Sequence, residues 1–294
     1  MSPSAGGGSR QRDTRRRKSG HSMVQSPTSL FDVSGKVVLI TGGAQGMGRM
    51  IAEGFVAGGA RVHITSRKAD VAAAAAEAMN AQATRAEATG ATGACIAIAR
   101  DLSSPEDATA LARDIAERET RLDVLINNAG RTWGAPLATF PDKAWASVMA
   151  VNVQAPFTLV RDLLPLLRAA ATASDPARVI NIGSLAGRIV ERLSAFSYAA
   201  SKAAVHHLTR ELAAELARDR ITVNTVVPGY FPTQMTSHIR AGEERLAGLV
   251  ERIPLGRLGS AQDVVGACVM LSSRAGAYIT GSEIVIDGGL AGCR

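Results

Sequence analysis

The 294-residue chain has few cysteines and few aromatic residues. The three cysteines are odd in number and far apart, at Cys95, Cys268 and Cys293, which argues against a disulfide framework or a metal site and favours a reducing compartment. Aromatic residues make up 4% of a chain that is 46% hydrophobic, so the core must be built from aliphatic side chains. No apolar run reaches the ~18 residues that a membrane span needs. The length suits one large α/β domain or two small ones.

Acidic side chains are almost absent from residues 1–22, where Asp13 is the only acid beside six basic residues. This segment has a net charge of +5, so the rest of the chain carries only +2 of the total +7 (7 − 5). Because it is rich in Gly and Ser and nearly free of apolar residues, the segment 1–29 is predicted to be a disordered basic tail. A nucleic-acid partner is not expected, because the globular part has little excess charge.

The sequence alone leaves several alternatives for the role of this tail. It has no apolar segment like that of a secretory signal. A transit peptide, a nuclear-type basic cluster, an anion-binding arm and an incidental extension are the alternatives, and Met23 is an alternative start of the chain. We expect a cytoplasmic protein, with targeting to an organelle as the alternative.

A glycine-rich turn follows the first strong strand pattern. Residues 37–40 are all apolar and mostly β-branched, which is typical of a central strand in a parallel sheet. Gly42, Gly46 and Gly48 follow, and a helix is predicted to begin near Gly46. Glycine lets a ligand approach the main chain closely, and the free N–H groups and positive dipole end of the helix point into the turn. The pattern predicts a site for a dinucleotide pyrophosphate.

Strand patterns and helical patterns alternate along the chain. Strands are predicted at residues 37–40, 62–66, 94–99, 122–126, 178–182, 221–227 and 283–286. Helices are predicted at residues 69–86, 105–118, 142–170, 196–219 and 261–273, with the third interrupted near Pro156 or Pro165. The alternation predicts an α/β fold, a single Rossmann-type domain over residues 30–294 with a doubly wound parallel sheet of about seven strands and helices on both faces. The ligand crevice should lie beyond the C-terminal ends of the strands, with a substrate lid at about 230–252.

Polar residues follow the fourth and fifth predicted strands. Asn127-Asn-Ala-Gly130 can hold the glycine-rich turn, and Ser184 can donate a hydrogen bond to a carbonyl oxygen. Tyr198 and Lys202 are four residues apart on a predicted helix and therefore share a face. A Lys ammonium beside a phenol favours the phenolate and lowers the pKa of the Tyr. Tyr198 is thus a candidate general acid or base, a role worth ~10²–10⁴ in rate.

Taken in order, these motifs resemble those of the short-chain dehydrogenase/reductase family over about residues 30–290. The resemblance extends to Asn152 as a member of the catalytic tetrad, to Pro228-Gly229 followed by Thr233, and to Asp287-Gly-Gly289 near the C-terminus. It implies a homotetramer or homodimer.

The resemblance also implies roles for the tetrad. Tyr198 would protonate the alkoxide as hydride arrives from a nicotinamide, or deprotonate the alcohol in the reverse direction. Lys202 would lower the pKa of Tyr198 and bind the nicotinamide ribose. Ser184 would orient the carbonyl, and Asn152 would hold a water that links Lys202 to solvent.

The end of the second predicted strand lacks an acid. NAD enzymes of this type place a carboxylate there for the ribose hydroxyls, but this chain has Thr65-Ser-Arg-Lys68. Ser66 and Arg67 suit a 2′-phosphate, so the cofactor is predicted to be NADP(H), although many NADP-using relatives have a basic residue where this chain has Gln45. The predicted cofactor-binding residues are Gly42, Gln45, Gly46, Met47, Gly48, Ser66, Arg67, Asp101, Leu102, Asn128, Ala129, Gly130, Tyr198, Lys202, Pro228, Gly229 and Thr233.

A narrower resemblance, to 3-oxoacyl-(acyl-carrier-protein) reductases, rests on the segments 131–135, 163–168, 176–184 and 231–239. It implies reduction of a 3-oxoacyl thioester carried on acyl carrier protein or CoA. An apolar wall for an acyl chain, or ordinary lid packing, is predicted for Phe231, Met235, Ile239, Leu246 and Leu249, and the same pocket for Trp133 and Leu185.

Two other functions stay open. The substrate could be a free secondary alcohol, a sugar or another small carbonyl compound, or the chain could be a non-catalytic NADP-binding regulatory protein. Arg188 and Arg192 either meet an acidic carrier or are exposed loop residues. His206 and His207, just beyond Lys202, are assigned to helix packing or a subunit interface, since no third ligand is near enough to suggest a metal.

Overall fold

The computed structural model describes residues 26–86, 93–191, 193–233 and 242–293. Its centre is a sheet of seven parallel strands in the order β3-β2-β1-β4-β5-β6-β7. The strands are β1 (Val37–Ile40), β2 (Arg61–Ser66), β3 (Ala94–Ala99), β4 (Val124–Asn127), β5 (Ala177–Ile182), β6 (Ile221–Pro228) and β7 (Glu283–Ile286). The predicted Rossmann-type fold is therefore confirmed, and no strand boundary differs from its prediction by more than two residues.

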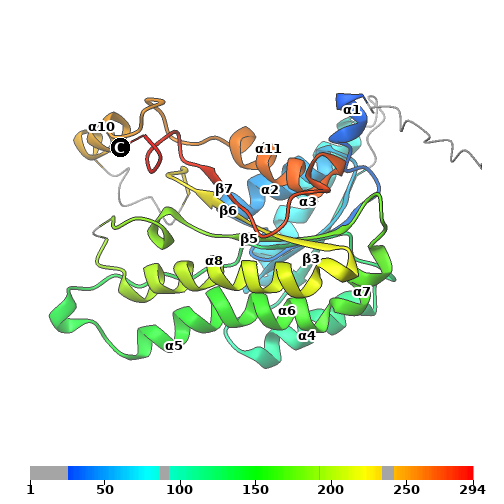
Figure 1. Cartoon of the computed structure of the whole chain (residues 1–294), viewed down its shortest axis with the longest axis horizontal. Helices are drawn as coiled ribbons and strands as arrows, with labels where there is room; N and C mark the ends of the chain where they lie inside the picture. Colours follow the sequence, from blue (N-terminus) through cyan, green and yellow to red (C-terminus); the bar gives the residue numbers. More distant parts are fainter. Residues whose placement is uncertain (1–25, 87–92, 192, 234–241, 294) are drawn as a thin grey trace, which may run out of the picture.

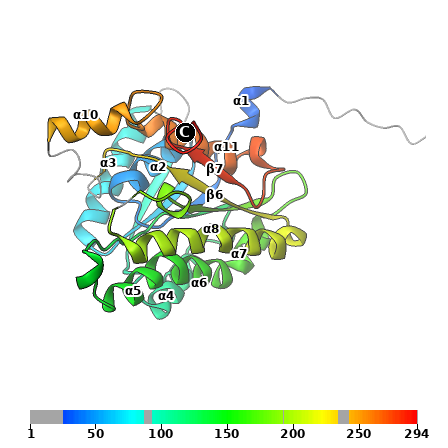
Figure 2. The same cartoon turned by 60° about the vertical axis from the view of Figure 1, so that its left-hand side comes forward.

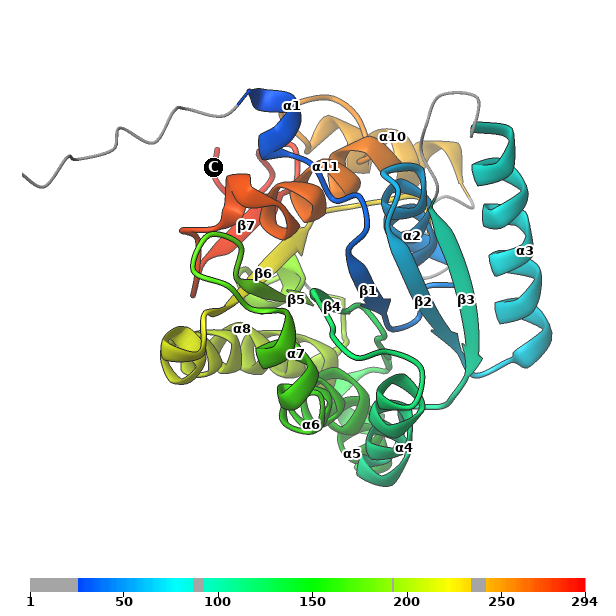
Figure 3. The same ribbon diagram turned by 90° about the vertical axis from the view of Figure 1, so that its right-hand side faces the viewer.

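Helices cover both faces of this sheet (Figure 1, Figure 3). One layer holds α2 (Gly46–Ala57), α3 (Ala69–Ala86) and α11 (Ala261–Ser272), and the other holds α4 (Pro105–Ala116), α5 (Lys143–Met149), α6 (Ala155–Asp162), α7 (Leu164–Ala170) and α8 (Phe196–Leu216). Each layer has its own apolar core, which explains why β1 is buried along its whole length. Because these strands are buried on both faces, their sequences are nearly continuous apolar runs.

The predicted helix over 142–170 is interrupted, as expected, but in two ways. A π-helical turn, η3 (Ala150–Gln154), separates α5 from α6, and a break at Leu163 separates α6 from α7. Pro165 lies in the first turn of α7, where the missing N–H of proline costs no hydrogen bond, whereas Pro156 directly follows the π turn in uninterrupted helical backbone. The π turn was not predicted, and it contains the buried Asn152.

The two ends of the predicted domain differ from expectation in detail. A short helix, α1 (Pro27–Leu30), lies inside the segment assigned to the tail, while residues 1–25 lie outside the described part of the chain. The predicted lid contains α10 (Glu243–Glu251), and its residues 234–241 are also outside the described ranges. Figures 1 and 2 show α10 on the side of the sheet away from α4 to α8.

The topology fixes where a ligand can bind. The chain runs β1-β2-β3 towards one edge and then crosses back, so that β4 pairs with the other side of β1. Such a reversal leaves a crevice beyond the C-terminal ends of the two central strands. The glycine-rich turn after β1 and the Asn127-Asn-Ala-Gly130 segment after β4 meet there.

Candidate active site

The glycine-rich turn is tied to the end of β4 by Asn128. The Asn128 side-chain amide donates to the carbonyl oxygens of Thr41, at 2.8 Å, and Gly42, at 3.2 Å. The Thr41 hydroxyl accepts from the backbone N–H groups of Asn128 and Ala129, each at 3.0 Å. Gly42 has a φ of +65°, a conformation that favours glycine. Four hydrogen bonds therefore attach the predicted cofactor turn to the end of β4.

Gly48 has no room for a side chain. A Cβ atom there would clash with Asn128 Nδ2 and with the carbonyl oxygen of Gly42. We expect Gly48→Ala to push the turn away from β4 and to weaken binding of the predicted cofactor NADPH about tenfold or more, since overpacking costs ~1–3 kcal/mol. A fluorescence titration with NADPH measures this.

The matched control is Gly266→Ala in α11, where an added Cβ meets open space. Alanine is the better helix former by about 0.5–1 kcal/mol, so this variant should bind NADPH normally and melt no lower than the parent protein. Equal binding by both alanine variants would contradict the assigned role of Gly48.

Two basic side chains stand free at the C-terminal end of β2. Arg67 and Lys68 are exposed, and within the described ranges neither forms an ion pair with a carboxylate. The Ser66 hydroxyl accepts from Lys68 N at 3.2 Å, and Thr65 Oγ1 accepts from Gly42 N at 3.0 Å. The second hydrogen bond joins this strand end to the glycine-rich turn, so both predicted parts of the cofactor site are adjacent.

Several other predicted cofactor residues follow the C-terminal ends of β1, β3 and β6. Thr233 lies against the turn, since a Cβ on Gly46 would be 3.6 Å from the Thr233 side chain. Gly229 lies against Asp287, whose Cα would be 2.8 Å from an added Cβ. After β3, Asp101 Oδ1 accepts from the backbone N–H of Leu102 at 2.8 Å. Gln45 is exposed directly before α2, with no capping hydrogen bond from its side chain.

Asn152 connects the loop after β4 to α8, the helix of Tyr198 and Lys202. Its Oδ1 accepts from Arg131 N at 2.8 Å, and its Nδ2 donates to the Arg131 carbonyl and to Ser201 Oγ, both at 2.9 Å. The extra residue of the π turn carries this side chain, and such turns are frequent at functional sites. The assigned role of holding a water for Lys202 stays a proposal.

Lys202 is buried beside Tyr198 on the same face of α8. Its Nζ donates to the carbonyl oxygen of Ile182 at 2.7 Å and lies 5.7 Å from the centre of the Tyr198 ring. Burial lowers the pKa of Lys202 to about 8. The ammonium is thus mostly charged at neutral pH and loses its charge in mild alkali.

The predicted lowering of the Tyr198 pKa is wrong for the polypeptide alone. Burial raises the pKa of this phenol, the nearby charge of Glu191 raises it further, and a hydrogen bond with Ser184 opposes both effects. Removal from water penalises the phenolate, and the amine of Lys202 does not overcome it. Tyr198 is held as a neutral phenol, the form that donates a proton.

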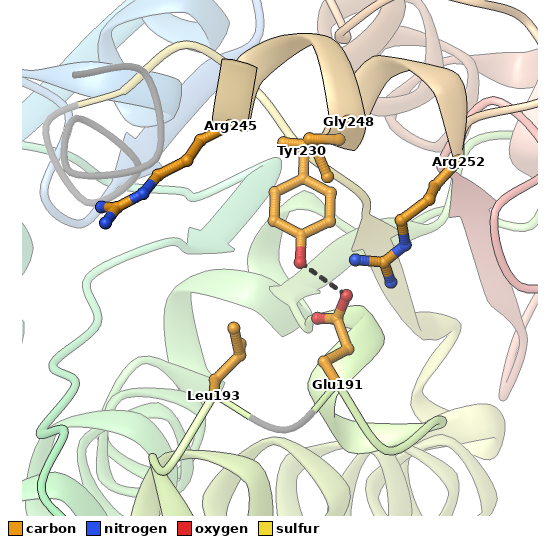
Figure 4. Close-up of a pocket in the computed structure, with 7 residues that line it drawn as sticks. Glu191, Leu193, Tyr230, Arg245, Gly248 and Arg252 are labelled. Carbon is orange, nitrogen blue, oxygen red and sulfur yellow. Dashed lines mark hydrogen bonds between the residues drawn. The ribbon is translucent and has the colours of Figure 1, made fainter. Parts of the chain in front are cut away.

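A cavity of about 310 Å³ opens between the loop after Ser184 and α10 (Figure 4). It is lined by Glu191, Leu193, Tyr230, Arg245, Gly248, Leu249 and Arg252. The Tyr230 hydroxyl donates to Glu191 Oε1 at 2.8 Å. The charge of Glu191 raises the pKa of Tyr198, although Tyr198 is not among the residues that line the cavity.

The sequence predicted only part of this lining. Leu249 lines this cavity, but Phe231 and Leu185 are core residues, because Phe231 packs against Gly259 and Leu185 is in a buried cluster with Val227, Ile253 and Leu290. Met235 and Ile239 lie outside the described residues. Glu191, Tyr230 and the two arginines were missed, since a single polar residue on a loop or lid has no spacing pattern that reveals it.

The described part of the chain was expected to hold neither a metal site nor a membrane-spanning helix. No group of three or more His, Cys, Asp or Glu side chains in it could hold a metal ion. Among the same residues, none of the helices is both long and apolar enough to cross a membrane.

Comparisons with known proteins agree with this geometry. A family model described as enoyl-(acyl carrier protein) reductase matches residues 42–291. The chain is 44% identical to the rhamnolipid biosynthesis 3-oxoacyl-[acyl-carrier-protein] reductase of Pseudomonas aeruginosa, over 88% of this chain and 97% of the relative. It is 36% identical to the 5-keto-D-gluconate 5-reductase of Escherichia coli, over 89% of this chain and 97% of the relative. The solved RhlG/NADP active-site complex of P. aeruginosa superposes with a TM-score of 0.82 at 43% identity, covering 89% of this chain and 98% of that one. The chain therefore belongs to the short-chain dehydrogenase/reductase family of oxidoreductases.

Proposed function

We propose that this protein is an NADPH-dependent reductase that converts a 3-oxoacyl thioester into the 3-hydroxyacyl thioester. The Ser184 hydroxyl donates a hydrogen bond to the ketone oxygen, and Tyr198 gives that oxygen its proton. The bound nicotinamide supplies the hydride. Lys202, charged at neutral pH, stabilises the phenolate that proton transfer leaves and would donate hydrogen bonds to the ribose of the bound cofactor.

The choice of NADP(H) is supported by charge at the end of β2. Arg67 and Lys68 are exposed there, and no carboxylate within the described ranges pairs with them. A guanidinium recognises a phosphate through paired N–H donors, whereas a carboxylate at this place would repel it. The relative superposed above was solved as a complex with NADP.

The substrate class is supported by one observation, a group of exposed apolar side chains (the apolar rim) on the loop that contributes Glu191 and Leu193 to the cavity and on the loop bonded to it. Trp133, Val190, Leu193 and Phe196 are all exposed, and Val190 is 86% exposed. The loops are held together, because Ala135 N donates to the carbonyl of Ser194 at 3.1 Å. Exposed apolar patches are typical of binding sites, and this rim suits an acyl chain. The relative that is 44% identical reduces a 3-oxoacyl group carried on acyl carrier protein.

Basic side chains that line the cavity suit a thioester carrier. Arg245 and Arg252 extend from α10 on either side of Tyr230 (Figure 4). Both are exposed, and within the described ranges neither pairs with a carboxylate. A phosphate on the arm of CoA or acyl carrier protein could bind them. Arg188 is a weaker candidate, because its Nε lies 3.5 Å from Glu283 Oε2. Arg192 lies outside the described residues.

A second substrate class is a keto sugar acid. The Tyr230–Glu191 hydrogen bond places a hydroxyl and a carboxylate inside the cavity, and either arginine could bind a sugar carboxylate. A relative that is 36% identical is a 5-keto-D-gluconate 5-reductase.

A substrate series separates the two classes. With NADPH in excess, we expect higher kcat/KM for 3-oxoacyl thioesters than for 5-keto-D-gluconate, and a gain of up to about fourfold for each methylene that the rim buries, at ~0.8 kcal/mol per CH₂. Leu193→Ala should weaken this dependence on chain length, whereas Leu255→Ala, which removes an exposed leucine outside the cavity lining, should not. Faster turnover of 5-keto-D-gluconate would select the second class.

Assembly and location also belong to the proposal. Family precedent suggests a homotetramer or homodimer, and the exposed Trp145 of α5 and Phe157 of α6 offer apolar surface for a subunit contact. We expect the protein to work in the cytoplasm.

A further inference from the structure

His206 is buried against the strand end that carries the catalytic serine. It lies on α8 one turn beyond Lys202 and is 3% exposed. Its ring packs on Gly183 so closely that a Cβ there would clash with Nε2. Nε2 accepts a hydrogen bond from the backbone N–H of Ser184 at 3.3 Å. The other ring nitrogen, Nδ1, lies 3.4 Å from Glu283 Oε2.

These contacts define the protonation of the ring. A nitrogen that accepts from a backbone N–H carries no proton, so the proton of neutral His206 is on Nδ1, facing Glu283. Glu283 in turn is held by Arg210, with Nη1 at 2.9 Å, and by Arg188, with Nε at 3.5 Å. Burial lowers the pKa of His206; Glu283 opposes this, while Lys202, Arg188 and Arg210 lower it further.

The contact acts on the serine through its backbone. Ser184 N–H is held by His206, and Ser184 Oγ accepts from Ala186 N at 3.2 Å. With Oγ already accepting from the main chain, its own proton is directed towards Tyr198 and the substrate oxygen. Loss of the His206 contact would leave a buried N–H without a partner, and the segment that aims the hydroxyl would shift.

We propose that His206 is a positioning residue: its neutral ring, oriented by Glu283, fixes the Ser184 backbone so that the serine hydroxyl points at the substrate carbonyl. This inference rests on the proposed reductase function. Protonation would put an N–H on Nε2, facing the N–H of Ser184, and two donors cannot bond to each other. Reduction should therefore fail as the ring becomes charged.

The direction of the pH effect follows from the groups around the ring. The neutral ring is the working form, so activity is retained above the pKa of folded His206, which lies below 6.5, and is lost as pH falls through it. Glu283→Gln removes the group that raises this pKa and should move the acid limb to lower pH. Arg210→Gln removes a charge that lowers it and should move the limb to higher pH.

Two substitutions of His206 test the contact itself. In His206→Leu no acceptor is left for Ser184 N–H, and we expect kcat to fall ~10-fold or more, from the cost of an unpaired buried donor. In His206→Gln the side-chain oxygen can accept instead, so most of kcat should return and the acid limb should flatten. NADPH binding should change little in either variant.

The neighbouring histidine provides a matched control. His207 is exposed and contacts Arg210 and Glu211 at the helix surface, so His207→Leu should keep both kcat and the acid limb. The inference is overturned if His206→Leu folds and keeps the parent kcat and pH profile, or if His206→Gln is as impaired as His206→Leu.

A measurement without substrate separates this inference from the proposed function. The amide resonance of Ser184 in the whole protein should titrate with the His206 ring, and it should lose that titration in His206→Gln but keep it in His207→Leu. A Ser184 amide that does not respond to pH would overturn the inference even in an active enzyme. Titration of the amide in a protein that reduces no carbonyl would overturn the reductase function and leave the His206 contact standing.

Discussion

Tyr198→Phe should lower turnover of a 3-oxoacyl thioester by ~10²–10⁴-fold, the usual worth of a positioned general acid. The substitution removes the proton that the ketone oxygen receives and leaves the ring in place. The surroundings of Tyr198 raise the pKa of its phenol, so the residue is a proton donor before the reaction begins. Initial rates of NADPH oxidation give the loss, and a fluorescence titration should find NADPH binding almost unchanged.

Tyr278→Phe is the control for this variant. Tyr278 is fully exposed, so removal of its hydroxyl should alter neither the rate nor the binding. Full activity of Tyr198→Phe would contradict the assigned mechanism. Loss of NADPH binding together with activity would show that the phenol matters for the cofactor site and not for proton transfer alone.

Arg67→Ala should lower kcat/KM for NADPH about 10–100-fold and leave kcat/KM for NADH nearly unchanged. The range follows from hydrogen bonds to charged groups, worth ~1.5–3 kcal/mol. Arg67 is exposed beside Ser66 at the end of β2, and the two dinucleotides differ only in the ribose 2′-phosphate that NADPH carries. Steady-state rates with each dinucleotide, at a fixed carbonyl substrate, measure the change.

Arg85→Ala is the matched control, because Arg85 is an exposed arginine in the last turn of α3. It should keep the parent ratio of the two kcat/KM values. An equal fall with NADPH and NADH in Arg67→Ala would mean that the residue supports the strand end and does not read the phosphate. In that case Lys68 would become the candidate for binding the 2′-phosphate.

The sheet and the order of its motifs could be predicted from sequence for a physical reason. Strands such as β1 are buried on both faces, so each appears as an unbroken apolar run. Because β4 and β5 are parallel neighbours, the polar residues that follow them lie close together at the C-terminal ends of the strands. Asn128, Thr41 and the turn glycines are joined there by hydrogen bonds, as the motif predicted.

Other features depend on contacts that no local pattern contains. The π turn at Ala150–Gln154 changes the backbone register without altering the apolar pattern of the helix. The pKa of Tyr198 is set by burial and by Glu191, and neither effect is visible in the Tyr-x-x-x-Lys spacing. The hydrogen bond between His206 and Ser184 joins residues 22 apart in the chain. Arg245 and Arg252 line the cavity because α10 lies opposite the loop of Glu191 in the folded chain.

The measurement that tests the central claim most directly is the rate of cofactor oxidation with a short 3-oxoacyl thioester, compared for NADPH and NADH. We predict turnover with a clear preference for NADPH. Preference for NADH would contradict the assigned role of Arg67. Tight NADPH binding without turnover of the thioester or of 5-keto-D-gluconate would contradict the reductase function and favour a cofactor-binding regulatory protein.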